Sequence, residues 1–400
     1  MNERQLFLQN LAQTSDTPLS LNIKKAEGIH LFDENGKIYI DFISGIGVSS
    51  LGHCHPNVVQ AVRHQAEQYM HTMVYGEYVL TPQVELAKRI TDTLPAQLDN
   101  VYLVNSGAEA VECAMKLAKR YTGRAEIIAC KNAYHGSTQG ASSLMHPTTY
   151  NQAFRPLLPG ITHIEFNNFE DIHHITQQTA AVILEPIQAE AGVIVPNYDW
   201  MKFLRKRCSD TNTLLIFDEI QTGIGRTGTL WAFQQLGVIP DVLLSAKGLG
   251  GGMPIGACIS SKQIMSSFMK NPILGHITTF GGHPVTAAAA VATLDTLLKE
   301  ESIIRGVKSK ADLIVRRLRT HPIVKEVRSA GLLIAVDIGD FDLLVNVIKH
   351  CLANGLIVDW FLFNEKSIRI APPLIITEEQ LNEACDILID ALNVCASNKY

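Results

Sequence analysis

Short apolar runs alternate with amphipathic stretches through the middle of the chain. The runs are rich in β-branched residues and too short to be helices, so they predict buried strands. These strands are expected at residues 101–104, 127–129, 181–184, 214–217 and 242–245. Between them, the spacing of apolar positions predicts helices at residues 107–121, 199–210 and 229–236. The alternation predicts an α/β fold in which helices cover both faces of a mainly parallel sheet.

The two ends of the chain follow a different pattern. Residues 29–43 contain a turn around Asn35 between two extended stretches, which predicts a hairpin. Toward the C-terminus the pattern predicts a long helix after about residue 290, strands near 333–338 and 367–370, and helices at 341–353 and 378–396. We therefore expect a large domain over residues 51–289 and a smaller α+β domain built from both termini, residues 1–50 and 290–400.

Composition narrows the class of protein. The 400 residues are 46% hydrophobic and 18% charged, the balance of a folded globular protein with a large core. The 34 basic and 39 acidic side chains leave a net charge of −5 without a basic block, so we expect neither nucleic acid nor a membrane as a partner. The apolar run at 287–298 falls short of the about 18 residues of a membrane helix and predicts a buried helix.

The cysteines give an expectation about compartment. All eight are scattered, without a C-x-x-C pair, and the chain opens with the polar residues MNERQ rather than an apolar leader. A reduced, cytoplasmic protein is therefore expected. His53 and His55 flank Cys54, but the sequence offers no clear further ligands, so no metal is assigned.

The strongest local signal is Lys247, which follows an apolar strand and precedes a turn that contains four glycines. Most lysines are solvated surface charges. Here the preceding segment is expected to lie in the sheet, where burial makes a permanent ammonium costly. Such a lysine has either a lowered pKa or a covalent role as an imine, and the glycines let a bulky ligand approach the backbone.

A carboxylate stands at the end of the preceding predicted strand. Asp218 closes the apolar run 214–217, at the edge where open α/β sheets place their ligands. Alone, it would be interpreted as a helix cap or half of an ion pair. Together with Lys247 it becomes a candidate partner for a protonated pyridine nitrogen, which would keep a cofactor ring cationic.

The segment 223–228 matches G-x-G-x-x-G, a pattern of dinucleotide-binding folds. In those folds the pattern follows a strand directly and opens a helix. Here the segment Asp218–Gln221 separates it from the strand, and a new element is expected to begin at Thr229. We therefore do not assign a nicotinamide site.

Two segments are candidates for binding a phosphate. After the strand at 101–104, Ser106 can cap a helix that has Glu109 in the capping-box position. This can simply be a well-capped helix, but Gly107 and Ala108 also leave backbone N–H groups open to an anion, which the helix dipole favours. The second and weaker candidate is 276–282, where Thr278 and Thr279 precede two glycines.

Two further side chains are candidates for ligand contact. Tyr134, followed by His135 and Gly136, could present its ring to a flat ligand, although a lone aromatic residue usually belongs to the core. Arg369 stands in a strand pattern just before two prolines. Its forked, permanently charged guanidinium suits a carboxylate ligand.

In this order, these pieces resemble the class III (ω-amino acid) aminotransferases of the fold-type I pyridoxal-phosphate family. The resemblance runs from about residue 29 to residue 377. It rests on the motifs DFISGIG, LGHCHP, NSGAEAVE, AYHG, LEPIQAEAG, FDEIQTGIGRTG, SAKGLGGG, TTFGG and RIAPPL. So many ordered motifs make the assignment specific, and the resemblance implies that pyridoxal 5′-phosphate is the cofactor.

The resemblance also implies a role for each cofactor residue. Lys247 would form the Schiff base, Asp218 would pair with the pyridine nitrogen, and Gln221 would approach the ring hydroxyl. Tyr134, with His135 beside it, would stack on the ring. The phosphate would be held by Ser106, Gly107 and Ala108, and by Thr279 of a second subunit, because such sites lie at a homodimer interface.

The substrate side follows from the same resemblance. Arg369 and Glu190 resemble the arginine–glutamate pair that lets one pocket accept either an amine or a dicarboxylate, and Thr278 and Ser137 are expected near the substrate. The donor would resemble ornithine or acetylornithine, and 2-oxoglutarate would accept the amino group. Acetylornithine enzymes usually carry an arginine where this chain has Ser137, so putrescine or 4-aminobutyrate is an alternative donor.

Two other hypotheses are weighed against a transaminase. Another pyridoxal-phosphate reaction, such as an aminomutase or epimerase, could use the same scaffold, and the chain could be a catalytically idle interaction protein. Lys247 and Asp218 argue against the idle protein. The pair of Arg369 and Glu190 favours a transaminase, which must accommodate two different substrates.

Overall fold

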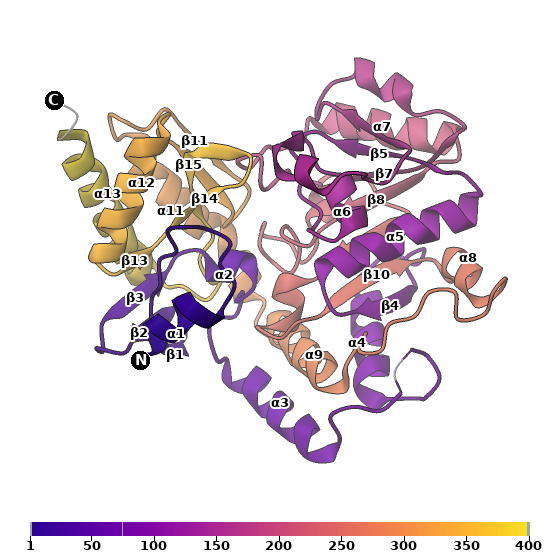
Figure 1. Ribbon diagram of the computed structural model, residues 1–400, viewed down its shortest axis with the longest axis horizontal. Helices are drawn as coiled ribbons and strands as arrows, with labels where there is room; N and C mark the ends of the chain where they lie inside the picture. Colours follow the sequence, from indigo (N-terminus) through magenta and orange to yellow (C-terminus); the bar gives the residue numbers. More distant parts are fainter. Residues whose placement is uncertain (1, 74, 398–400) are drawn as a thin grey trace.

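The computed structural model describes residues 2–73 and 75–397 (Figure 1). Its centre is a seven-stranded sheet. In spatial order the strands are β4 (Asn100–Val104), β10 (Gly256–Ser260), β9 (Val242–Ser245), β8 (Leu214–Asp218), β7 (Thr179–Leu184), β5 (Glu126–Cys130) and β6 (Ile161–Ile164). The strands from β9 to β6 run parallel to their neighbours. Only β10 breaks the pattern, because it is antiparallel to both β4 and β9.

Helices cover both faces of this sheet, as its alternating side chains require. In β8, Ile216 packs in a cluster with residues of α5 (Gly107–Thr122). Its neighbours Leu215 and Phe217 belong to the cluster on the other face. That face is covered by α4 (Thr81–Asp92), α7 (Tyr198–Asp210) and α9 (Pro284–Lys299). A strand buried on both faces is apolar throughout, which explains the continuous apolar run of β8.

A second body, beside the large sheet in Figure 1, combines both ends of the chain. One of its sheets has the order β1 (Ile23–Glu27), β2 (His30–Asp33), β3 (Ile38–Asp41) and β13 (Leu356–Ile357). The other has the order β11 (Glu326–Ser329), β12 (Ile334–Asp337), β15 (Asn364–Ile370) and β14 (Asp359–Phe361). The associated helices are α11 (Val307–Arg319), α12 (Phe341–Ala353) and α13 (Glu378–Ser397). The N-terminal and C-terminal parts of the chain meet in the first of these sheets, where β3 pairs with β13 in parallel.

The remaining helices are shorter or lie at the periphery. They are α1 (Glu3–Asn10), α2 (Ser44–Gly47), α3 (Pro56–Gln68), α6 (Gln139–Ser143), α8 (Lys262–Met265) and α10 (Ser302–Arg305). Within the described ranges, no helix combines the length and the apolar character needed to cross a membrane.

The predicted mainly parallel sheet, its five strands and the hairpin at 29–43 are confirmed. The helix predicted at 229–236 is wrong, because only a single 3-10 turn forms, at Ala232–Gln235. Trp231 is extended, with φ −120° and ψ 132°, and the buried carboxylate of Glu219 accepts the N–H groups of Ala232 and Phe233, which caps the turn and starts it at Ala232. The domain boundaries stay a prediction; α9 passes through residue 290.

Candidate functional site

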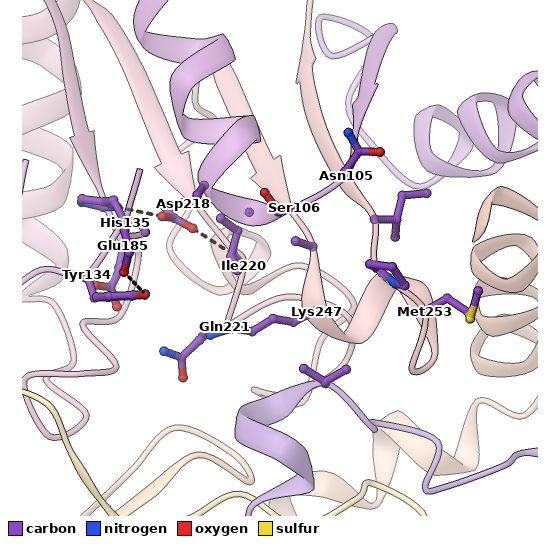
Figure 2. Close-up of a pocket in the computed structure, with 18 of the residues that line it drawn as sticks. Asn105, Ser106, Tyr134, His135, Glu185, Asp218, Ile220, Gln221, Lys247 and Met253 are labelled. Atoms are coloured by element: carbon purple, nitrogen blue, oxygen red, sulfur yellow. Dashed lines mark hydrogen bonds and ion pairs between the residues drawn. The ribbon is translucent and has the colours of Figure 1, made fainter. Parts of the chain in front are cut away.

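A cavity of about 440 Å³ opens beyond the carboxyl ends of β8 and β9 (Figure 2). Its walls come from the turns that follow β4, β5, β7, β8 and β9, which is where a parallel sheet brings separate loops together. Among its lining residues are Ser106, Gly107, Ala108, Tyr134, His135, Ser137, Glu185, Asp218, Gln221 and Lys247. The cavity therefore gathers most of the residues that the sequence singled out.

Lys247 begins a 3-10 turn directly after β9 and points its side chain into this cavity (Figure 2). Its backbone has φ +43°, a conformation uncommon for a residue with a side chain. Within the described residues, its amine has no hydrogen bond or ion-pair partner. Burial lowers the pKa of Lys247 to about 8, although the charge of Glu190 opposes the shift. About a tenth of the amine is therefore neutral and nucleophilic at pH 7, far more than for a lysine with the ordinary pKa.

Asp218 ends β8 and is buried, with 3% of its side chain exposed. One oxygen, Oδ2, lies 2.7 Å from Nδ1 of His135, and Oδ1 accepts the N–H of Ile220 at 3.0 Å. Burial alone would lower the pKa of His135, but the hydrogen bond and charge of Asp218 outweigh it and raise that pKa. These contacts fix the carboxylate at the cavity wall, where it can hold a positive charge on a ligand.

The start of α5 is the candidate anion cradle. The hydroxyl of Ser106 caps the helix by accepting the N–H of Glu109 at 3.2 Å. The N–H groups of Gly107 and Ala108 lie in the first helical turn, where a helix offers them no acceptor. The predicted capping box is not formed, because the carboxylate of Glu109 accepts from the backbone and side-chain N–H groups of Asn105 instead.

Gly136 brings the loop after β5 against this cradle. Its φ of +121° is a conformation that side chains rarely adopt. A Cβ at this position would lie 2.6 Å from the Cβ of Ala108, so the close approach requires glycine. This packing brings Tyr134 and His135 to the same wall of the cavity as the start of α5.

Glu185 is a lining residue to which sequence reasoning gave no role. It follows β7, and its carboxylate accepts the N–H groups of Tyr134 at 3.1 Å and Ala189 at 2.6 Å. Burial raises the pKa of Glu185 to about 7, with His135 opposing the rise. The signal available in the sequence was a carboxylate directly after a buried strand, the same signal that identified Asp218.

A second, outer cavity of about 970 Å³ adjoins the first, because Tyr134, Ser137 and Lys247 line both. In its lining, Arg369 of β15 donates from both terminal nitrogens to the carboxylate of Glu190, each at 2.9 Å. Both side chains are about 95% buried, and Arg369 also stacks on the ring of Phe361 at 4.8 Å. Burial would raise the pKa of Glu190, but Arg369, the N–H of Leu362, Lys247 and Gln221 together outweigh it and hold that pKa below its ordinary value.

Gln221 and Ser137, both predicted from the sequence, lie at the boundary between the two cavities. Gln221 donates to Glu190 at 2.7 Å, and it also lines the inner cavity. Ser137 is exposed, and its hydroxyl lies 3.1 Å from that of Tyr134. Both residues therefore lie where the substrate would pass from one cavity to the other.

Thr278 and Thr279 lie apart from both cavities of their own chain. The hydroxyl of Thr278 accepts a hydrogen bond from the side chain of Asn105 at 3.0 Å, while Thr279 is exposed. Their predicted contacts with substrate and with the phosphate of a second subunit stay predictions.

The motifs that were set aside have structural roles. In the segment 223–228, Arg226 is buried and donates to the carbonyl oxygens of Leu332 and Pro372, which ties the loop to the smaller body. His53 lies 2.8 Å from the carboxylate of Asp41. In the described part of the chain, no group of three or more histidine, cysteine or acidic side chains is arranged to hold a metal ion.

The donor set of the inner cavity fits pyridoxal phosphate. A phosphate needs the open N–H groups at the start of α5, a ring nitrogen needs a buried carboxylate, and an aldehyde needs a neutral amine. The unpartnered amine of Lys247 and the fixed carboxylate of Asp218 supply the last two in one cavity. Tyr134 adds an aromatic side chain to its wall.

Comparisons with known proteins agree with this chemistry. Residues 11–392 match the family model described as Aminotransferase class-III. An acetylornithine aminotransferase from Methanopyrus kandleri is 40% identical over 370 residues, which cover 92% of each chain. The ornithine aminotransferase from Toxoplasma gondii ME49 has a TM-score of 0.90 at 31% identity, covering 100% of this chain and 97% of that one. Another structure of the Toxoplasma gondii enzyme, with a TM-score of 0.90 at 32% identity and 99% and 95% coverage, has partial occupancy of PLP at its active site.

Proposed function

The chain belongs to the class III aminotransferases, which use pyridoxal phosphate, and we propose that it moves the terminal amino group of an ornithine- or acetylornithine-like donor to 2-oxoglutarate. The observation that carries the proposal is the pairing of two cavities. An unpartnered lysine amine faces both, and the lining of the outer one includes an arginine paired with a glutamate. Relatives about 40% identical are named acetylornithine aminotransferases, which supports a donor of this class.

The residues of the inner cavity have distinct chemical tasks. When bound, pyridoxal phosphate supplies an aldehyde and an electron-withdrawing ring. Lys247 would hold the cofactor through its amine, and the same amine would move a proton to and from the substrate carbon. Asp218 keeps a proton on the pyridine nitrogen, and His135 holds that carboxylate in place.

The outer cavity must accept two substrates in turn. With the pair of Arg369 and Glu190 closed, the arginine is neutralised and an amine donor enters. When 2-oxoglutarate enters, the carboxylate beside its keto carbon, which a terminal amine donor lacks, replaces Glu190 on Arg369, because a forked guanidinium binds any carboxylate in the same bidentate geometry. Glu190 keeps a partner nearby in Gln221.

A homodimer is part of the proposal. Exposed apolar side chains gather in residues 70–73, 75–79 and 269–280, where Val79 is 91% and Ile273 is 74% exposed. The segments lie side by side, because the ring of His71 is 4.9 Å from that of Phe280. An apolar surface of this kind is typical of a subunit interface, and it includes the exposed Thr279 that would reach the partner's phosphate.

A cytoplasmic location is also proposed. All eight cysteines are unpaired, which suits a reducing compartment.

One observation favours an alternative donor. The cations that line the outer cavity, within the described residues, are Lys247 and Arg369, and Arg369 is already paired. Ser137 offers only a neutral hydroxyl to the α-carboxylate of acetylornithine. Putrescine or 4-aminobutyrate is therefore the second candidate.

The experiment is a transamination assay. Purified protein loaded with pyridoxal phosphate is given 2-oxoglutarate and each amine, and glutamate formation is followed. We expect glutamate from at least one of ornithine, acetylornithine, putrescine and 4-aminobutyrate. If none of the four amines yields glutamate above a control without enzyme, the proposed function is wrong.

A further inference from the structure

Arg369 is held by a second carboxylate besides that of Glu190. Asp359 of β14 lies directly opposite Arg369 in the antiparallel pairing of β14 with β15. Its Oδ1 is 3.1 Å from Nε of the guanidinium, on the side that Glu190 leaves open. Asp359 also lines the outer cavity.

The two carboxylates differ in how far their hydrogen-bonding capacity is used. Glu190 accepts from both terminal nitrogens of Arg369, from Gln221 and from the N–H of Leu362. Asp359 accepts no hydrogen bond in the described part of the chain, and Oδ1 is buried without one despite its ion pair. With 25% of its side chain exposed, Asp359 keeps acceptor capacity at the cavity wall.

The other charges of the outer cavity show why the free acceptor capacity of Asp359 matters for ligand binding. The charged side chains that line it, among the described residues, are Glu190, Lys247, Asp359 and Arg369. Lys247 is assigned to the cofactor in the proposed function, so its charge is not counted here. The pair of Arg369 and Glu190 is neutral when the two side chains are in contact. Asp359 is therefore the remaining charge, and it is negative when ionised. Burial raises its pKa to about 7 against the pull of Arg369, so a cation beside it would favour the ionised form.

We propose that Asp359 selects among amine donors by binding a free ammonium group at the end of the donor that does not react. The inference rests on the proposed aminotransferase function and deepens it, because it names the chemical class of donor. Ornithine and putrescine carry a second ammonium group. Acetylation of the α-amine of ornithine removes it, and 4-aminobutyrate carries a carboxylate in its place.

The test is Asp359→Asn, which keeps the shape and removes the charge. Specificity constants are compared within two donor pairs, ornithine against acetylornithine and putrescine against 4-aminobutyrate. We expect each ratio to fall on the order of tenfold in the variant, since a charge-assisted contact is lost for only one donor of each pair. Asp359→Glu, which restores the charge, should recover part of each ratio.

Asp337→Asn is the matched control. Asp337 lies in the same sheet, with 22% of its side chain exposed, and it faces Arg328 at 3.9 Å outside the cavity. Its substitution should leave both ratios unchanged. If Asp359 only positioned Arg369, Asp359→Asn would change the use of all four donors together with the Michaelis constant for the keto-acid acceptor. Both ratios would then stay constant, and this result would overturn the inference.

A measurement on the wild-type protein covers the case in which Asp359→Asn does not fold. Putrescine and n-butylamine share the reacting amine, but only putrescine has a distal ammonium group. We expect putrescine to be the better donor by about tenfold or more, whereas equal or better use of n-butylamine would overturn the inference. Failure of the proposed function is distinguishable, because in that case the wild-type protein transaminates none of these amines.

Discussion

Nδ1 of His135 lies 2.7 Å from Oδ2 of Asp218 inside the cavity wall, and both side chains are almost fully buried. The other oxygen of Asp218 is taken by the N–H of Ile220. With both oxygens engaged, the carboxylate cannot rotate away from the cavity. A group that stabilises charge is most effective when it needs no reorganisation, and this arrangement meets that condition.

Asp218→Asn should keep the fold and the cofactor but lower turnover by roughly a thousandfold, because a neutral amide cannot hold the charge on the pyridine nitrogen. The measurement is kcat with the best donor, together with cofactor absorbance. A loss below about tenfold, near 1.4 kcal/mol, would mean that Asp218 is only a structural cap.

The pKa of Lys247 predicts how the cofactor is captured. Because burial lowers that pKa to about 8, the amine is mostly protonated below pH 8 and mostly neutral above it. Only the neutral amine reacts with an aldehyde. The rate at which apo-protein captures pyridoxal phosphate should therefore rise about tenfold per pH unit below 8 and level off above it. Stopped-flow absorbance from pH 6 to 9.5 measures this, and a rate that falls with pH would contradict it.

Thr279→Ala tests the shared site. If the threonine of one subunit completes the phosphate site of the other, the variant should remain dimeric and lose pyridoxal phosphate about tenfold more readily on dialysis, since one charge-assisted hydrogen bond is removed. Sedimentation and cofactor retention are measured together. A wild-type protein that is active as a monomer would rule the shared site out.

Ser137→Arg tests what limits the donor. An arginine here would offer a bidentate grip on the α-carboxylate of acetylornithine, worth about 2–3 kcal/mol, or a change of about 30- to 150-fold. The ratio of specificity constants for acetylornithine over putrescine should rise by that order. A wild-type enzyme that strongly prefers acetylornithine and is unaffected by Ser137→Arg would show that this position does not choose the donor.

The residues that the sequence located best are those whose role depends on local chain order. Asp218 ends one buried strand and Lys247 follows the next, and in a parallel sheet neighbouring strand ends meet at one edge. The anion cradle likewise needs only a strand, a cap and a helix. An apolar run followed by a carboxylate or a lysine carries this information without any knowledge of distant contacts.

What the sequence could not show depends on pairings between distant segments. Asp359 meets Arg369 only through the register of β14 on β15, and no local pattern specifies a register. Glu185 acts through N–H groups of other loops. The helix predicted at 229–236 forms only as a turn at Ala232–Gln235, because Trp231 is extended and the carboxylate of Glu219, from a distant segment, fixes the start of the turn at Ala232.

The central claim is that Lys247 holds the cofactor covalently, and reduction followed by peptide mass spectrometry tests it most directly. Protein loaded with pyridoxal phosphate is treated with borohydride, digested and searched for the phosphopyridoxyl mass. We expect the modification on Lys247, and its absence together with a loss of transamination in Lys247→Ala, while the exposed Lys262→Ala behaves as wild type. The modification on another lysine, or full activity of Lys247→Ala, would contradict the account.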